Sequence, residues 1–126
     1  MSVLAVVWIG LGSALGGLGR YLISGMVARR FGETFPWGTL VVNLSGALLI
    51  GVLAGAGALA VGEVRQFLII GVLGSYTTVS SFSLQTLALV REGERWPALA
   101  NILLSLAGCL LMATLGYLAS QTLLGS

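Results

Sequence analysis

The sequence contains no lysine, aspartate or histidine, and only 8% of its 126 residues are charged. Soluble proteins carry about 25% charged residues, so this composition excludes an ordinary soluble domain. There is no histidine to activate a serine and no carboxylate inside an apolar run, so no catalytic constellation is visible and we expect a protein that is not an enzyme. The net charge of +2 rests on six scattered arginines, too few for a nucleic-acid surface.

Cysteine is nearly absent as well. The single cysteine, Cys109, excludes an internal disulfide and a cysteine-based metal cluster. Its place within an apolar run indicates a core thiol. All acidic residues lie outside the apolar runs, at Glu33, Glu63, Glu92 and Glu94.

Long apolar runs dominate what is present, since 57% of the residues are hydrophobic. The runs cover about 3–27, 38–61, 66–90 and 97–122. Each exceeds the roughly 20 residues that a helix needs to cross a hydrocarbon core about 30 Å thick. The first run lacks a basic leading segment and is too long for a signal peptide. We therefore expect an all-α, multi-pass protein of the cell membrane, with four transmembrane helices in one domain over residues 1–126 and with lipid around it.

Nineteen glycines in so short a chain predict close contacts between helices. Gly12 and Gly16 are four residues apart, and small residues recur at the same spacing in the second and fourth runs. Such spacing lets helix backbones approach each other in a membrane. Four helices barely enclose a path, so we also expect an oligomer.

The third run contains an unusual polar stretch. From Ser75 to Ser83, seven of nine residues carry a hydroxyl, and Gly71 and Gly74 lead into the stretch. Polar side chains at membrane depth must face protein, an ion or a water-filled path. We predict that this helix is broken in mid-membrane, which exposes backbone groups for ion binding. The alternative is that the hydroxyls bond to their own helix or join neighbouring helices.

Other runs contain single polar residues. Arg20 lies well inside the first run, Asn43 lies one helical turn from Thr39 in the second, and Ser105 lies one turn from Asn101 in the fourth. The embedded charge is positive and has no embedded carboxylate beside it. This favours an anion or a neutral solute over a cation.

Three segments together resemble a known family. The segment from Gly71 and Gly74 through Thr77-Thr78 to Phe82-Ser83 resembles the third-helix signature of the CrcB/Fluc fluoride channels. Residues 37–44, Trp-Gly-Thr-Leu-Val-Val-Asn-Leu, look like that family's second-helix signature, and Gly12, Gly16 and Arg20 fit its first. The resemblance implies a dual-topology, antiparallel dimer that exports fluoride passively and so lowers its cytoplasmic concentration.

The resemblance also implies site residues. A structural sodium ion, which is not transported, would be held by the backbone carbonyls of Gly74 and Thr77. Fluoride accepts hydrogen bonds and donates none, so amides and hydroxyls suit it, and the positive edge of a phenyl ring can stabilise an anion. The candidate pore-lining residues are Asn43, Phe82, Val79, Thr78, Ser81, Ser105, Thr39 and Arg20.

Three positions depart from the family pattern. Val79 stands where the family usually has its first pore phenylalanine, Gln85 where a glutamate is common and Cys109 where a serine is common. Because some family members work as paired, non-identical subunits, the partner is either a second copy of this chain or a paralogous subunit. Arginine counts in the loops also leave the choice between single and dual topology open.

Two other functions remain as alternatives. One is a small four-helix exporter of cationic drugs, which would need an embedded carboxylate to exchange a proton for its substrate. The other is a non-conducting subunit of a heterodimeric channel.

Overall fold

The structure, a computed structural model, describes residues 3–32, 34–57 and 62–124, and these residues form helices and short connections. Two uninterrupted helices come first, α1 (Val3–Phe31) and α2 (Trp37–Gly55). The third span is assembled from consecutive pieces, and one long helix closes the chain. These pieces are α3 (Gly62–Val64), the π-helical η2 (Arg65–Leu73), α4 (Gly74–Tyr76) and α5 (Val79–Arg91), followed by α6 (Arg95–Leu124).

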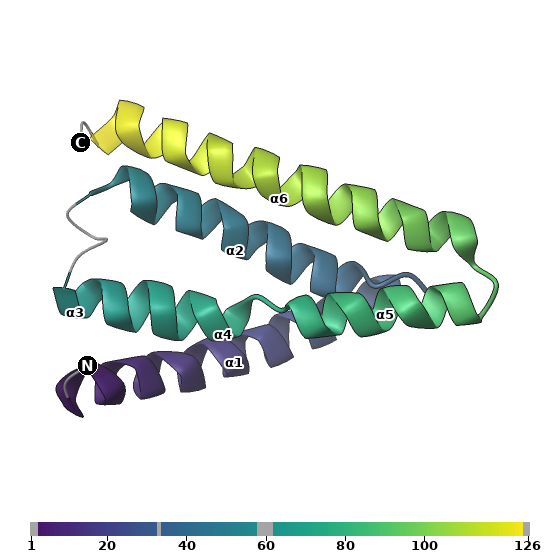
Figure 1. Cartoon of the computed structure of the whole chain (residues 1–126), viewed down its shortest axis with the longest axis horizontal. Coiled ribbons are helices and arrows are strands. Elements are labelled where there is room, and N and C mark those ends of the chain that lie inside the picture. Colours follow the sequence, from purple (N-terminus) through teal and green to yellow (C-terminus); the bar gives the residue numbers. More distant parts are fainter. Residues whose placement is uncertain (1–2, 33, 58–61, 125–126) are drawn as a thin grey trace.

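Four helical stretches are long and apolar enough to cross a membrane. This confirms the predicted helical class and the number of spans. Figure 1 shows the four stretches running between the same two ends of the molecule, with both chain termini at one end.

Several predicted boundaries were wrong. The first span continues through Arg29 and Arg30 to Phe31, because arginine is a good helix former and its long side chain can reach the interface from a helix end. The second helix ends at Gly55, not at residue 61: Gly57 has a φ of +61°, which stops helical propagation. Residues 58–61 lie outside the described residues. The expected connection over 62–65 is instead helical.

Glycines allow the closest helix contacts, as the sequence predicted. Gly12 on α1 faces Gly71 on η2 so closely that a Cβ on either would overlap the other helix's backbone. One turn later, a Cβ on Gly16 would collide with the Val72 carbonyl and the Ser75 hydroxyl. α2 packs against α6 in the same way, with Gly51 against the backbone of Ala113. The first part of the third span is therefore fastened to α1, and α6 is fastened to α2.

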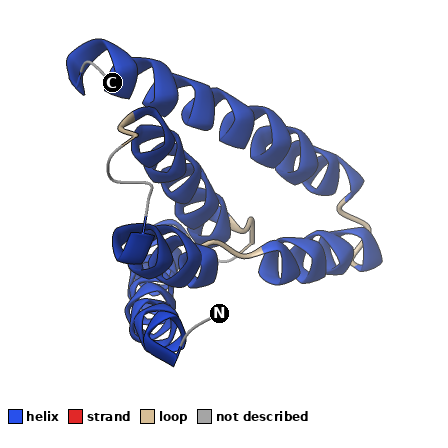
Figure 2. Cartoon of the chain, turned by 60° about the vertical axis from the view of Figure 1, so that its left-hand side comes forward, coloured by secondary structure: helices blue, strands red, loops and turns tan. Residues whose placement is uncertain are grey.

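The second part of the third span is held more loosely. α5 lies near α6 at their connecting loop and diverges from it further along (Figure 2). Val79, at the start of α5, is 77% exposed. The buried apolar core is a small cluster of Val42, Leu73 and Tyr76. A single chain thus leaves most of its large apolar side chains on the surface, where lipid or another subunit must cover them.

Candidate functional site

The candidate site forms around an interruption of the third span. Thr77 (φ −77°, ψ 154°) and Thr78 (φ −147°, ψ 120°) are extended and separate α4 from α5. The Asn43 side chain closes this interruption from α2. Its Nδ2 donates to the Thr78 carbonyl at 2.9 Å, and its Oδ1 accepts from the Thr78 N–H at 2.8 Å. One amide thereby satisfies both backbone groups of the residue at the break.

The interruption changes the backbone pairing of the preceding turn. In a continuous helix the N–H of Thr78 would bond to the Gly74 carbonyl, and that of Ser81 to the Thr77 carbonyl. Here the Thr78 N–H bonds to Asn43, and the Ser81 N–H bonds to the Thr78 hydroxyl at 3.1 Å as an N-cap. The carbonyls of Gly74 and Thr77 have thus lost their helical donors.

Hydroxyls before the break bond within the protein. Ser75 donates to the Ser13 carbonyl on α1 at 2.8 Å, and Tyr76 shares a 2.8 Å hydrogen bond with Ser45 on α2. Thr77 donates back to the Leu73 carbonyl at 3.0 Å. These three side chains follow the alternative prediction for the hydroxyl stretch: Ser75 and Tyr76 join neighbouring helices, and Thr77 bonds back to its own span.

Two hydroxyls from the break onward, those of Thr78 and Ser81, line hollows instead. We call the first hollow the arginine hollow: it has about 210 Å³ and is lined by Gly17, Arg20, Tyr21, Ser24, Thr39, Thr78 and Ser81. Arg20 is partly buried, and no ion pair joins it to a carboxylate within the described residues. An uncompensated guanidinium surrounded by hydroxyls forms an environment that attracts anions.

A second hollow lies between α2, α5 and α6. This phenylalanine groove has about 440 Å³ and is lined chiefly by apolar side chains. Its lining is Asn43, Ala47, Ile50, Thr77, Thr78, Val79, Phe82, Ser105, Leu106, Cys109 and Leu110. Few polar groups in an apolar groove suit weak contact with a small anion along a path.

The structure divides the predicted pore residues between the two hollows. Arg20, Thr39 and Ser81 line the arginine hollow, while Asn43, Val79, Phe82 and Ser105 line the phenylalanine groove. Thr78 lines both. The interruption therefore stands where the two hollows meet.

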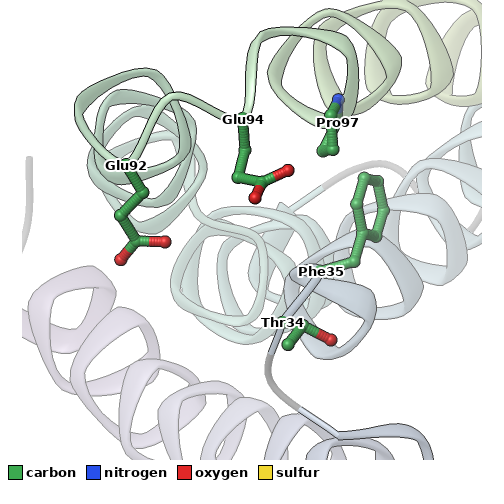
Figure 3. Close-up of a pocket in the computed structure, with 5 residues that line it drawn as sticks. All are labelled: Thr34, Phe35, Glu92, Glu94 and Pro97. Atoms are coloured by element: carbon green, nitrogen blue, oxygen red, sulfur yellow. The ribbon is translucent and has the colours of Figure 1, made fainter.

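A third hollow lies at the loop end of the molecule. It has about 630 Å³, and its lining includes two acidic residues, Glu92 and Glu94 (Figure 3). Glu94 extends toward Phe35 across this hollow. Two carboxylates repel an anion, so the candidate anion site does not lie here.

The chain is similar to proteins of a known family along most of its length. The model of the family described as "CrcB-like protein, Camphor Resistance (CrcB)" matches residues 7–117. The chain belongs to the CrcB family. Together with the four apolar helices, this makes it a multi-pass membrane protein.

Relatives in the CrcB family cover nearly the whole chain. "Fluoride-specific ion channel FluC 2" of Rhodopseudomonas palustris (strain BisB18) is 50% identical over 123 residues, which is 94% of each chain. "Fluoride-specific ion channel FluC" of Opitutus terrae is 50% identical over 118 residues, 90% of this chain and 89% of the relative. The protein of the same name from Rhodospirillum rubrum is 45% identical over 118 residues, 90% of this chain and 92% of the relative.

Two polar residues near the groove of this CrcB protein were not among the predicted site residues. Asn101 on α6 is 2% exposed and donates to Thr86 on α5 at 2.8 Å. The sequence showed Asn101 one turn from Ser105, but it gave no sign that Thr86 would be its partner. The signal available in the sequence was one polar residue on each of two consecutive spans, the third and the fourth.

Proposed function

We propose that this protein is a fluoride channel that lets fluoride leave the cell passively. The observation that carries this proposal is membership of the CrcB family, with relatives about half identical over nine-tenths of the chain and named as fluoride-specific channels. Passive export helps the cell because HF is neutral, crosses lipid and dissociates inside. The membrane potential then drives the anion out through a channel.

The site suits this task. The guanidinium of Arg20 attracts an anion into the arginine hollow, where the hydroxyls of Thr39 and Ser81 can donate hydrogen bonds to it. Thr78 lines the passage to the phenylalanine groove, where the ring edge of Phe82 and the hydroxyl of Ser105 offer further weak contacts. Several weak contacts in succession bind an ion well enough to enter and weakly enough to leave.

We further infer that two copies insert antiparallel, with the interruption of the third span at membrane depth. Two observations support a partner copy and this placement of the interruption. Val79 and the hydroxyl of Ser83 are exposed on α5, and an exposed hydroxyl in a spanning helix needs a polar or protein partner. The interruption also lies near the middle of the 62–91 span.

A structural sodium ion fits the residues at the interruption. The carbonyl oxygens of Gly74 and Thr77 have lost their helical donors, and carbonyl oxygens are suitable ligands for a hard cation. No carboxylate lies within two residues of either position in the sequence, so a monovalent ion is the better match. Bound there, sodium would neutralise these carbonyl dipoles and link two subunits.

The exporter of cationic drugs is not supported. Such a protein exchanges protons at an embedded carboxylate. Here Glu63 lies at the start of the third span, and Glu92 and Glu94 lie beyond its end. Family membership also points away from it. The non-conducting subunit of a heterodimer keeps one supporting observation, the valine at position 79.

The test is fluoride efflux from liposomes that contain this chain alone, with a potassium gradient and valinomycin setting the voltage. We expect rapid, voltage-driven fluoride efflux that does not depend on a proton gradient. Efflux only after a second family member is added would favour the heterodimer. Efflux driven by a proton gradient alone would contradict the channel.

A further inference from the structure

A buried amide on α6 forms a bridge to α5 beside the phenylalanine groove. Asn101 is 2% exposed and, with Val42, is among the most deeply buried side chains of the described residues. Burying an amide is costly unless it is hydrogen-bonded. Its Nδ2 donates to the Thr86 hydroxyl at 2.8 Å, and Thr86 donates to the Phe82 carbonyl at 2.7 Å. The chain of bonds runs from α6 through a threonine side chain to the backbone of the groove's phenylalanine.

The direction of these hydrogen bonds is fixed by the number of protons on the Thr86 hydroxyl. A hydroxyl has one proton to donate, and the Thr86 hydroxyl directs it to the Phe82 carbonyl. Thr86 can therefore only accept from Asn101, so the amide nitrogen of Asn101, and not its oxygen, faces α5. Hydrogen bonds linked in series strengthen one another, so the bridge is a defined connection between two helices that otherwise diverge (Figure 2).

The bridge lies in register with the groove. Phe82 and Thr86 are four residues apart on α5, and Asn101 and Ser105 are four apart on α6. Residues at this spacing lie above one another on a helix face, about 6 Å apart along the axis. The Thr86–Asn101 bond thus joins the helices one turn away from Phe82 and Ser105, two of the residues that line the groove.

We propose that Asn101 and Thr86 are positioning residues that set the separation between the Phe82 ring and the Ser105 hydroxyl, and thereby the preference for fluoride over a larger halide. This rests on the proposed fluoride conduction. Neither residue lines the groove, so both act through Phe82 and Ser105, which do. Without the bridge, α5 can move away from α6, and the wider groove admits chloride.

The first test is the ratio of fluoride to chloride efflux from liposomes. Asn101→Leu and Thr86→Val keep the side-chain size and remove the bond. The net free energy of one hydrogen bond corresponds to roughly a three- to tenfold change in an equilibrium constant, so we expect the ratio of fluoride to chloride efflux to fall by that factor. Thr86→Ser keeps the hydroxyl and should keep the ratio. Combining Asn101→Leu with Thr86→Val should be no worse than either alone, because both break one chain of bonds.

The chain offers a matched control at Thr114. Its hydroxyl bonds to the carbonyl four residues earlier at 2.8 Å, as that of Thr86 does, but it is exposed on α6 and has no amide partner. Thr114→Val should leave the ratio unchanged. An unchanged ratio in both Asn101→Leu and Thr86→Val, or an equal fall in Thr114→Val, would overturn the proposal.

A second readout does not need conduction. The chain has four phenylalanines, so fluorophenylalanine labelling gives few resonances, and Phe82→Leu identifies that of Phe82. We expect this fluorine resonance to shift or broaden in Asn101→Leu and Thr86→Val but not in Thr114→Val. If the wild-type chain passes no fluoride, the proposed function fails, and the resonance still decides whether the bridge positions Phe82.

Discussion

The two halves of the third span differ in how they are held. The first half, Gly62–Tyr76, packs against α1 through glycines, and its hydroxyls bond to other protein groups. The second half, α5, contacts its neighbours sparsely and borders both hollows. One span can therefore combine an anchor with a lining element, provided that the helix is interrupted between them. Asn43 stabilises that interruption.

The largest effect is expected from a change in the anchoring half. Gly16→Val places a branched side chain against the Val72 carbonyl and the Ser75 hydroxyl. Overpacking of this kind costs about 3 kcal/mol or more when backbone must move, so we expect loss of folded protein in detergent, measured by its unfolding temperature and its recovery after purification.

Gly10→Ala is the matched control for that change. Gly10 lies on the same helix with open space around it, so stability should stay near the wild-type value. An equal loss of stability in both variants would mean that α1 tolerates no change anywhere and that the close contact at Gly16 has no special role.

The next effect concerns the interruption itself. Asn43→Ala leaves the N–H and the carbonyl of Thr78 without their partner, and each unpaired buried group costs about 1–3 kcal/mol. A barrier raised by about 3 kcal/mol lowers a rate roughly a hundredfold, so fluoride flux should fall by about that factor. Near-normal flux in a folded, dimeric Asn43→Ala preparation would show that the amide is needed neither for the path nor for the break.

The lining half offers a pair of opposite changes. Phe82→Ile removes the aromatic edge from the groove, and an aromatic contact is worth roughly 1 kcal/mol or more; we expect flux to fall by at least about fivefold. Val79→Phe adds a ring at a residue that is 77% exposed in the single chain, and flux should persist or rise. A block by Val79→Phe would mean that the path is built around the smaller side chain.

The smallest effect within a single chain is expected at the proposed sodium site. Gly74 is helical (φ −61°, ψ −36°), and a Cβ there would meet only ordinary contact with the Ile69 carbonyl at 3.6 Å. Gly74→Ala should therefore barely change the stability of the monomer, and Thr77→Ser should be mild because the ligands are main-chain atoms.

Removing sodium should weaken the dimer and stop flux, measured by dimer mass and efflux. An unchanged dimer after exhaustive sodium removal would contradict the sodium site.

Sequence reasoning predicted the features that depend on residue type. Apolar runs long enough to span, glycines spaced four apart, and the polar stretch after Gly74 each have a direct physical consequence, and helix number, close contacts and polar hollows followed from them. It could not predict that Asn43 would bond to Thr78, because that contact joins residues 35 apart in the sequence. For the same reason it could not show that Arg20 and Phe82 would line two different hollows that meet at Thr78.

Boundaries failed where local geometry outweighed hydropathy. The apolar run through residue 61 predicted a longer second helix, yet Gly57 adopts a positive φ and ends it. Conversely, the charges of Arg29 and Arg30 suggested a loop, although charged side chains at a helix end cost little when they reach water.

The most direct test of fluoride conduction is the reversal potential of the current through a bilayer that contains this chain alone. Under a tenfold fluoride gradient, with equal chloride and pH on both sides, we expect reversal at about 59 mV of the sign that balances fluoride. We also expect that imposing a pH gradient leaves this value unchanged. A reversal potential that follows chloride or protons, or the absence of any current in a folded, dimeric preparation, would contradict it.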